Sequence, residues 1–388
     1  MKKLIYLIIV MVVLGIVISG CIPVVPPTEQ DNLNTFTKSI GSVVWVDDDW
    51  SGTVNGATVD GHTFGTDAFA TIQDGVDAVL PGGTVNVANG NYNAINSPFV
   101  RIIKPLSLIG ESRGGVILNG TGTSVISWAK GIHVTANDVT IKDLTVQNFG
   151  AVDYWGYGIV FRDYAHDTSG EGFVFYDGCM VDNVCSQNNC YPMYANCYIN
   201  LTICNCLIQD NLSDGMFIAK GSDNAVITGN TVLNSGDHGI WVGGSGWCGP
   251  SCDNAIITDN YVDGAREGGI SFVASTGATI SGNTITNVAG DGWSVGALSL
   301  KDGPSNVEAF NNTIYGNDGN WEGYNGTGHG IGIDGTPSNI YLNYNKIYDN
   351  AGYGIYNYSG ITIDATHNWW GHASGPGGEE GRTNPAGK

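Results

Sequence analysis

Short apolar runs recur at a fixed interval over residues 203–368. Each run carries an asparagine, and a glycine follows nine residues later in four of the units: Asn230 to Gly239, Asn260 to Gly269, Asn283 to Gly292 and Asn345 to Gly354. The shortest spacing from such a glycine to the next asparagine is 14 or 15 residues, so one unit is 23 or 24 residues long. Repetition at this period indicates a stacked architecture, because no single unit can bury its apolar face alone.

Apolar positions alternate within each unit, as Ile240 and Val242 do, which is typical of strands. β-Branched residues, Gly and Asn are abundant, whereas the spacing of three and four that marks a helix is missing. Short strands separated by Asn and Gly turns therefore predict a β-solenoid. Asparagines at the same turn of every coil would stack as a ladder about 4.8 Å apart, and Cys206 takes the asparagine position one unit before Asn230.

The units resemble the parallel β-helix repeats of the pectin-lyase-like superfamily, which are right-handed helices found in polysaccharide lyases, hydrolases, epimerases and surface proteins. The resemblance covers roughly Val43 to Gly375 and includes the opening phrases TVNVANGNY and LSLIGE and the closing phrase NWWG. It implies an all-β, right-handed parallel β-helix and leaves the activity open.

A short amphipathic helix is expected to cover the first coil of this β-helix. Ile72, Val76 and Val79 share one helical face, and Thr71 with Asp74 forms a capping-box pattern. Such a helix would protect strand edges that otherwise invite pairing with another chain. Over residues 179–206 the repeat pattern blurs, and the sequence does not align this coil with its neighbours.

The chain is expected to divide into an export signal at residues 1–21, a tether at 22–42, the β-helix at 43–375 and a C-terminal tail at 376–388. Lys2 and Lys3 precede a 15-residue apolar run, which is short for a membrane span. The run ends in Ile-Ser-Gly-Cys, which resembles the lipobox of prokaryotic lipoproteins, so Cys21 is expected to carry a lipid that anchors the exported chain to the membrane at the cell surface. The alternatives are an ordinary signal peptide and a single anchor helix.

The chain is strongly acidic. It has 36 Asp and Glu residues against 15 Lys and Arg residues among its 388 residues, which gives a net charge of −21 at pH 7. This charge repels nucleic acid and anionic membrane surfaces, and it repels a polyuronate unless cations bridge the two. It therefore excludes nucleic acid as a partner and favours a polysaccharide other than pectate. We expect a monomer.

Nine cysteines occur, and Cys21 is assigned to the lipid. In an exported chain the remaining eight are candidates for disulfides, and Cys248 and Cys252 lie close enough in one loop to pair. The other six allow 15 connectivities, and the sequence does not choose among them: Cys179, Cys185, Cys190, Cys197, Cys204 and Cys206. Alternatives for these residues are core positions filled by a small side chain and, less favoured, a zinc site.

Acidic residues and histidines gather at one turn when the coils are superposed on the recurring glycine. The column before the glycine reads Asp214, His238, Gly268, Asp291, His329 and Tyr353, and the column before that reads Ser213, Asp237, Glu267, Gly290, Gly328 and Gly352. Side chains one coil apart lie about 4.8 Å apart. Retaining glycosidases place two carboxylates about 5 Å apart and inverting ones about 6.5–9.5 Å apart. Asp214, Asp237 and Glu267, with His238, are therefore the candidate catalytic residues of a glycoside hydrolase.

Two other interpretations of this column remain open. Polar residues are common before a turn glycine for purely structural reasons. The same carboxylates also suit a bound Ca²⁺ ion, although no other cofactor is expected. A polysaccharide lyase is less favoured, because an Arg base of the pectate-lyase kind is not evident and Arg266 is the only candidate near the column.

Four coils carry extra residues, at 145–157, 243–255, 293–307 and 315–328. Insertions in solenoids form loops, often beside the binding face. These insertions supply tryptophans, and together with one strand residue they are the candidate sugar-binding side chains: Trp155, Trp241, Trp247, Trp293 and Trp321. Aromatic faces suit sugar rings, and the alternative of equal weight is that the same residues only hold the loops in place.

The function predicted from the sequence is a lipid-anchored, cell-surface parallel β-helix that binds, and by one hypothesis hydrolyses, an extracellular polysaccharide. The competing hypothesis is a structural or adhesive surface protein without turnover. A third and weaker hypothesis is an accessory protein of a membrane system.

Overall fold

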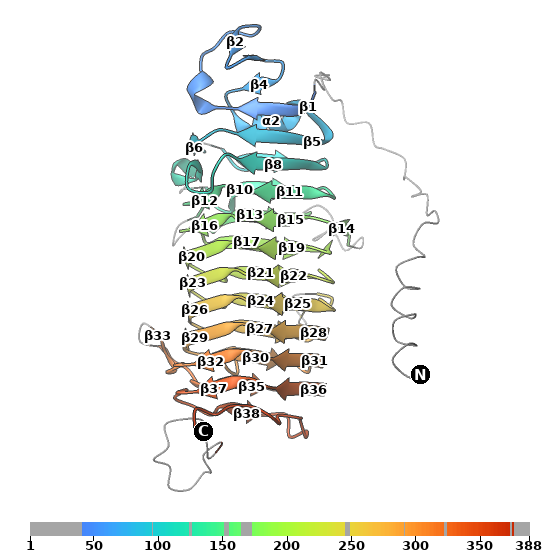
Figure 1. The fold of residues 1–388 in the computed structure, drawn as a ribbon, viewed down its shortest axis with the longest axis vertical. Helices are drawn as coiled ribbons and strands as arrows, with labels where there is room; N and C mark the ends of the chain where they lie inside the picture. The colour runs from blue at the N-terminus through green and yellow to red at the C-terminus, as the bar shows by residue number, and fades with distance from the viewer. Residues whose placement is uncertain are drawn as a thin grey trace, which may run out of the picture. The chain divides into compact units, whose positions relative to one another are not determined.

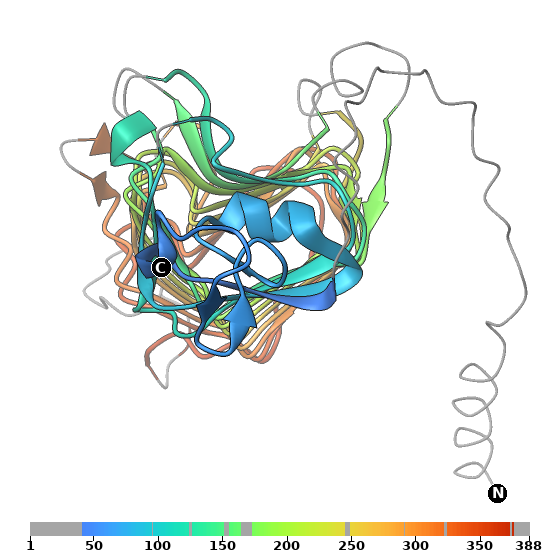
Figure 2. The same ribbon diagram turned by 90° about the horizontal axis from the view of Figure 1, so that it is seen from above.

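The computed structural model of the protein describes residues 41–94, 96–123, 126–150, 155–163, 173–244, 249–290, 292–321, 324–372 and 375. These residues form a right-handed parallel β-helix (Figure 1), which confirms the predicted fold. Each regular coil contributes one strand to each of three parallel sheets, which we call sheets I, II and III and whose strands are given below. Along the chain a coil passes through sheet I, then sheet III and then sheet II. Seen along the axis, the coils superpose on one another (Figure 2).

Sheet I is the longest of the three. Among the described residues its strands, in chain order, are β1 (Gly41–Val46), β4 (Ala68–Phe69), β5 (Val79–Val87), β8 (Leu106–Gly110), β11 (Val139–Lys142), β15 (Met180–Asp182), β19 (Thr202–Cys204), β22 (Val226–Thr228), β25 (Ala255–Thr258), β28 (Thr276–Ser281), β31 (Ser305–Phe310) and β36 (Ser338–Asn343).

Sheets II and III complete each coil. Sheet III consists of β6 (Gly90–Asn93), β9 (Val116–Asn119), β12 (Thr145–Gln147), β16 (Cys185–Gln187), β20 (Leu207–Asn211), β23 (Thr231–Ser235), β26 (Tyr261–Ala265), β29 (Thr284–Val288), β32 (Thr313–Tyr315) and β37 (Lys346–Tyr348). Sheet II consists of β7 (Val100–Ile102), β10 (Ala129–Val134), β13 (Gly156–Phe161), β17 (Tyr191–Asn196), β21 (Met216–Ala219), β24 (Ile240–Gly243), β27 (Ile270–Val273), β30 (Leu298–Lys301), β35 (Ile331–Ile333) and β38 (Ile355–Asn357).

Short elements decorate the coils. They are η1 (Asp48–Trp50), η2 (Thr121–Thr123), and the small strand pairs β2 (Thr58–Val59) with β3 (His62–Thr63), β14 (Tyr176–Asp177) with β18 (Tyr198–Ile199), and β33 (Asn320–Trp321) with β34 (Tyr324–Asn325). The predicted capping helix is confirmed as α2 (Ile72–Ala78). The Thr71 side chain caps it by accepting a hydrogen bond from the Asp74 amide at 3.1 Å, while Ile72 and Val76 are buried.

The core is a pile of apolar side chains that point inward from all three sheets. Ile227, Ile257 and Ile280 stand in register on β22, β25 and β28, and each is 0% exposed. Burying one such side chain stabilises the fold by about 1.5–3 kcal/mol. No coil could keep these residues from water alone, which explains why the repeat folds only as a stack.

The predicted asparagine ladder is confirmed at the corner between sheets I and III. This asparagine corner consists of Asn230, Asn260, Asn283, Asn312, Asn345 and Asn368. Within it the Asn283 amide nitrogen donates to Asn312 Oδ1 at 3.0 Å and to the Ile257 carbonyl at 2.8 Å. Cys206 continues the column through its backbone amide, which donates to Asn230 Oδ1 at 2.9 Å.

The alignment of the coils from sequence is wrong in one unit. Leu298 pairs with Ile270, so Ala297 occupies the glycine position there and Gly296 stands in the place assigned to Asp291. Residue 291 itself lies outside the described residues. The cause is the loop before β30, which contains extra residues. Gly292 lies within this loop, so its nine-residue spacing from Asn283 occurs by chance.

Candidate active site

The candidate site lies at the corner between sheets III and II, which we call the charged corner: residues 213–214, 237–238 and 266–268. Three successive coils meet there, because the Asp237 amide donates to the Ser213 carbonyl and the Glu267 amide donates to the Asp237 carbonyl, at 3.3 and 3.1 Å. The turn precedes β21, β24 and β27, so the tightly paired strands of sheet II fix the height of each side chain.

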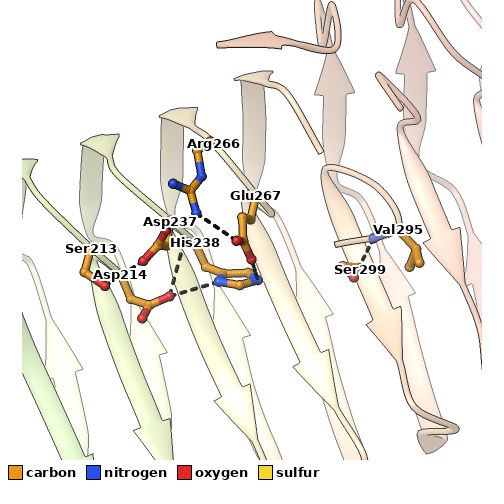
Figure 3. A network of polar contacts seen from close by, with 8 residues as sticks. All are labelled: Ser213, Asp214, Asp237, His238, Arg266, Glu267, Val295 and Ser299. Atoms are coloured by element: carbon orange, nitrogen blue, oxygen red, sulfur yellow. Dashed lines mark hydrogen bonds and ion pairs between the residues drawn. The ribbon is translucent and has the colours of Figure 1, made fainter. Parts of the chain in front are cut away.

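His238 lies between two carboxylates (Figure 3). Its Nδ1 is 2.9 Å from Asp214 Oδ1, and its backbone amide donates to the same oxygen at 3.2 Å. On the other side its Nε2 lies 3.4 Å from Glu267 Oε2. The side chain of His238 is only 5% exposed and that of Asp214 9%, so the imidazole is held in one orientation away from bulk water.

Arg266 joins the carboxylates of Asp237 and Glu267, which stand in the column two residues before the recurring glycine (Figure 3). Its Nη2 lies 2.5 Å from Asp237 Oδ1 and 2.9 Å from Glu267 Oε1, so these oxygens are neighbours around one nitrogen. The Ser213 hydroxyl donates to the second oxygen of Asp237 at 2.7 Å. The predicted meeting of Asp214, Asp237, Glu267 and His238 is therefore what the structure shows, and Arg266 is an additional member.

Glu267 has an altered acidity. Burial raises the pKa of its carboxyl above the ordinary value, the nearby charge of Asp237 adds to this rise, and the neighbouring His238 ring and Arg266 guanidinium oppose it. A carboxyl with a raised pKa keeps its proton closer to neutrality, which is the property that a general acid needs.

A row of aromatic rings on the outer face of sheet II runs beside the charged corner. Tyr194, Phe217 and Trp241 occupy the same register position on β17, β21 and β24. Their neighbouring ring centroids lie 4.9 and 5.7 Å apart, with nearly parallel planes. The next two strands have small residues at this position, Ser271 and Ser299, and the Trp293 ring packs beside them with its centroid 4.8 Å from that of Trp241.

The rings and the charged groups line one cavity of about 280 Å³. Its walls are Tyr191, Tyr194, Asp214, Phe217, Asp237, His238, Trp241, Glu267 and Trp293. Trp241 contacts both parts of the wall, because its ring meets the His238 ring edge-on at 4.7 Å. A concave site with apolar walls and a few convergent charged groups is the usual form of a small-ligand or substrate site.

Several buried polar atoms at this cavity have no hydrogen-bond partner among the described residues. They include Trp241 Nε1 on its wall and the hydroxyls of Ser271 and Ser294 beside it. The two hydroxyls and His238 crowd around Gly268, where an added Cβ would come within 2.3 Å of Ser271 Oγ and 3.2 Å of the His238 ring. Unpaired buried donors cost free energy, so their concentration at one place marks it as more than a structural turn.

Three of the four insertions reach the same side of the molecule as the charged corner. The loops within 145–157, 293–307 and 315–328 precede β13, β30 and β35 and therefore lie at the corner between sheets III and II, whereas 243–255 follows β24 at the other end of sheet II. Trp155 lies beyond the cavity, with its ring 5.6 Å from that of Tyr191. Trp247 lies outside the described residues, and Trp321 belongs to β33, but its side chain lies outside them too.

Sequence reasoning missed Tyr191, Tyr194 and Phe217 as cavity residues. They belong to coils between residues 179 and 217, where six cysteines and a blurred repeat hide the register. The signal that would have found them is the column itself, since Phe217 and Trp241 stand one residue after the first apolar residue of their strands.

The cysteines are mostly core residues. Cys179 and Cys206 pack in the central apolar cluster, Cys185 and Cys190 are also buried thiols, and burial raises the pKa of Cys179 to about 11. Cys252 is a free thiol with 0% exposure whose Sγ lies 3.7 Å from the Ile218 carbonyl oxygen. The free Cys252 thiol contradicts the predicted disulfide with Cys248, which itself lies outside the described residues.

A calcium ion does not fit the charged corner, because the Arg266 guanidinium already lies between Asp237 and Glu267 and would repel a cation. Among the described residues, a group of three carboxylates whose oxygens lie within 4.8 Å of one another occurs at Asp47, Asp48 and Asp49 on the first coil. Within the same residues no helix has the length and apolar character that crossing a bilayer requires. Cys21 lies outside them, so its lipidation also stays a prediction.

Comparisons with known proteins agree with the fold. The family model for a right handed beta helix region matches residues 130–300. The chain is similar to the Agl-KA catalytic domain (18% identity, 90% of this chain, 68% of that one, TM-score 0.51) and to the GH136 lacto-N-biosidase from Eubacterium ramulus (11%, 85%, 67%, 0.51). It is also similar to the A-module of the Azotobacter vinelandii mannuronan C-5 epimerase AlgE6 (16%, 85%, 99%, 0.49).

At these identities the likeness shows the fold alone. No curated protein matches the chain. The stacked three-strand coils, the family match and the solved structures together establish a right-handed parallel β-helix with a pectin-lyase-like fold.

Proposed function

We propose that the protein binds an extracellular polysaccharide along the aromatic row of sheet II and hydrolyses it at the charged corner. One observation carries this proposal: stacked rings and a cluster of carboxylates line the same cavity of about 280 Å³. Rings alone would indicate binding, and carboxylates alone would suit a structural turn. Their convergence is what a glycoside hydrolase needs, because it must hold a sugar ring while two carboxyl groups act on its glycosidic bond.

Glu267 is the proposed general acid, since its carboxyl is buried and has a raised pKa. Asp237 is the proposed second carboxylate, which faces Glu267 across the Arg266 Nη2 atom. Because the Asp237 and Glu267 oxygens both contact Arg266 Nη2, the two carboxyl groups are close together. Retaining glycosidases separate their two carboxyl groups by about 5 Å, and inverting ones by more. Hydrolysis is therefore expected to retain the configuration at the anomeric carbon. Asp214 holds the His238 ring, and His238 in turn contacts Glu267.

Two further features support a saccharide ligand. The unpaired buried donors at Trp241, Ser271 and Ser294 offer polar groups beside the rings, and sugars present both hydroxyls and apolar C–H faces. The same fold carries a lacto-N-biosidase in Eubacterium ramulus, so a saccharide site on a parallel β-helix has precedent. The net charge of −21 favours neutral glycans over polyuronates.

The test is release of reducing ends by the purified full chain from β-glucan, xylan, mannan and galactan. We expect turnover on at least one of them and a fall in kcat of about 10³-fold in Glu267→Gln. Asp263→Asn is the matched control, because Asp263 belongs to β26 of the same coil but lies outside the cavity. Binding without turnover on every glycan would support the adhesive hypothesis and contradict hydrolysis.

We also propose that the protein acts at the cell surface, held by a lipid on Cys21. The support is the Ile-Ser-Gly-Cys phrase after the apolar run. Replacing Cys21 with Ser is expected to move the protein out of the detergent phase in a phase-partition experiment, and mass spectrometry of the mature N-terminus would show the acylated cysteine. A wild-type chain that partitions to the aqueous phase would contradict the anchor.

A further inference from the structure

The two ends of the cavity differ. Toward the N-terminal coils further aromatic rings, Trp155 and Trp128, follow Tyr191 beyond the cavity. Toward the C-terminal coils the row stops at Trp293, and the residues at the row's register position on the next strands, Ser299 and Gly332, carry little or no side chain.

The C-terminal end is closed by the loop that carries Trp293. The Val295 amide donates to Ser299 Oγ at 3.3 Å, and a Cβ added to Gly332 would come within 1.8 Å of the Val295 carbonyl oxygen. The backbone of the loop therefore lies directly on the outer face of β30 and β35. Larger side chains at positions 299 and 332 would exclude it, so the small residues that interrupt the ring row make room for this barrier.

Neighbouring residues hold the barrier in place. Lys301 Nζ lies over the Trp293 ring, 4.5 Å from its centroid, and 3.3 Å from Asp334 Oδ2, so a cation held by an ion pair packs against the ring. The loop is also tied to the next insertion, because the Thr327 amide donates to the Gly290 carbonyl at 3.1 Å. Trp293 is thus a fixed wall.

Further aromatic rings lie at the N-terminal end of the cavity, at the corner between sheets III and II. There Tyr191 is followed by Trp155 and Trp128, whose rings stack at 5.7 Å and are 44% and 48% exposed. The register position of the row itself carries Val160 on β13, and Arg162 Cζ lies 5.7 Å from the Tyr194 ring centroid. Exposed stacked tryptophans on successive coils extend the apolar path along the axis of the β-helix. A polymer bound to this row would therefore run toward the N-terminal coils.

We propose that the protein acts on chain ends, with the terminal sugar against Trp293 and the polymer extending over Trp155 and Trp128. This inference rests on the proposed function and specifies its mode. Glu267 belongs to the coil of β27, and the barrier begins on the next coil, so the space between the cleaved bond and the wall spans one or two coils, or about 5–10 Å. The expected products are monosaccharides or disaccharides.

The first experiment follows products over time on the polysaccharide that the full chain cleaves. We expect mono- or disaccharides from the earliest time points, with little loss of viscosity per reducing end formed. Long oligosaccharides at early times, with rapid loss of viscosity, would overturn the inference while leaving hydrolysis itself intact.

The second experiment needs no turnover. Glu267→Gln is titrated with hexasaccharides of β-glucan, xylan, mannan and galactan that carry a bulky fluorophore at either the reducing or the non-reducing end. A label at the end that meets Trp293 is expected to weaken binding at least 10-fold, and a label at the other end to leave it unchanged. Equal tolerance of both labels would overturn the inference, and no binding to any probe would overturn it together with the proposed function.

Two variants locate the effect. Trp293→Ala is expected to restore binding of the end-blocked hexasaccharide and to lengthen the products. Trp155→Ala is expected to weaken binding of an unlabelled hexasaccharide about 5-fold more than that of the trisaccharide, because only the longer chain reaches it. End selectivity that survives in Trp293→Ala would contradict the assignment of the wall.

Discussion

The asparagine corner and the charged corner recur with the same period at the two ends of sheet III, yet they do different things. At the asparagine corner six successive coils have the same residue, and each inner amide both donates to one neighbour and accepts from the other. At the charged corner the residues change from Asp214 to His238 to Gly268 over three coils. A carboxylate only accepts hydrogen bonds, so it cannot form a ladder with copies of itself and needs a different donor on the next coil.

The difference shows how a repeat can be read for function. A column of identical, mutually satisfied side chains is explained by stability alone. The charged corner needs another explanation. Its side chains differ from coil to coil, they pair as acceptor and donor over only three coils, and they do not contribute to the stability of the other coils. Four changes test this comparison, in order of expected effect.

The largest effect is expected from Asp237→Asn. It removes the second carboxylate while keeping the shape of the side chain, so kcat/KM should fall about 10³-fold, which corresponds to about 4 kcal/mol in the transition state. The Asp237 side chain is 29% exposed, so the free energy of unfolding should change by less than about 1 kcal/mol. Kinetics on the cleaved glycan and a urea titration measure the two. A large loss of stability with unchanged kinetics would make the charged corner a structural element.

Asn283→Ala should have the opposite profile. The side chain is 0% exposed, and its removal leaves the Asn260 backbone and side-chain amides without the oxygen that they reach at 3.0 Å. The expected cost is about 3 kcal/mol of unfolding free energy with kcat unchanged for the folded protein. Asn93→Ala is the control, since the Asn93–Asn119 pair is exposed and should contribute less than about 1 kcal/mol. Equal losses in both variants would refute a special role of the buried ladder.

Glu267→Gln should change how stability depends on pH. The folded protein keeps the Glu267 proton to a higher pH than the unfolded chain, because its pKa is raised, so the free energy of unfolding falls as pH rises above the ordinary value of 4.5. Gln lacks this proton, and the variant should gain stability relative to wild type between pH 3 and pH 7 in urea titrations. Asp182→Asn should show the opposite sign, because hydrogen bonds from Asn205 and Lys142 lower the pKa of Asp182. The same sign in both variants would contradict the assignment.

The smallest effect is expected from His329→Gln. His329 occupies the same column as His238, but its Nδ1 accepts a hydrogen bond from the Tyr353 amide at 2.9 Å and its ring stacks on Tyr356 at 4.9 Å. Because no carboxylate flanks it among the described contacts, kcat should stay within about 2-fold, whereas His238→Gln should lower kcat at least 10-fold. Comparable losses in the two variants would show that the column matters for its packing rather than for its charges.

Much of the charged corner was predictable because the repeat converts sequence spacing into height along one axis. Asp214, His238 and Glu267 come together for that reason alone, as their backbones stand on adjacent coils. The contacts of Arg266 with Asp237 and Glu267 do not follow from the spacing, since a spacing does not tell which neighbouring carboxylates a long flexible side chain will reach. The coil before β30 was aligned wrongly because an inserted loop can reproduce a repeat spacing by chance.

The sequence alone predicts the β-helix, its asparagine ladder, its capping helix and the meeting of three acidic residues with a histidine. The helix follows from one capping box and one apolar face, and the other features follow from a local pattern that is repeated at a constant period and so stacks coil on coil. The tertiary structure alone decided that Phe217, Trp241 and Trp293 share a cavity with those acids and that the Trp293 loop closes one end of it. The path of a loop and the contacts of its rings depend on where small side chains on neighbouring strands leave space. Ser299 and Gly332 leave such space for the backbone of Val295, and the repeat period of the sequence does not predict it.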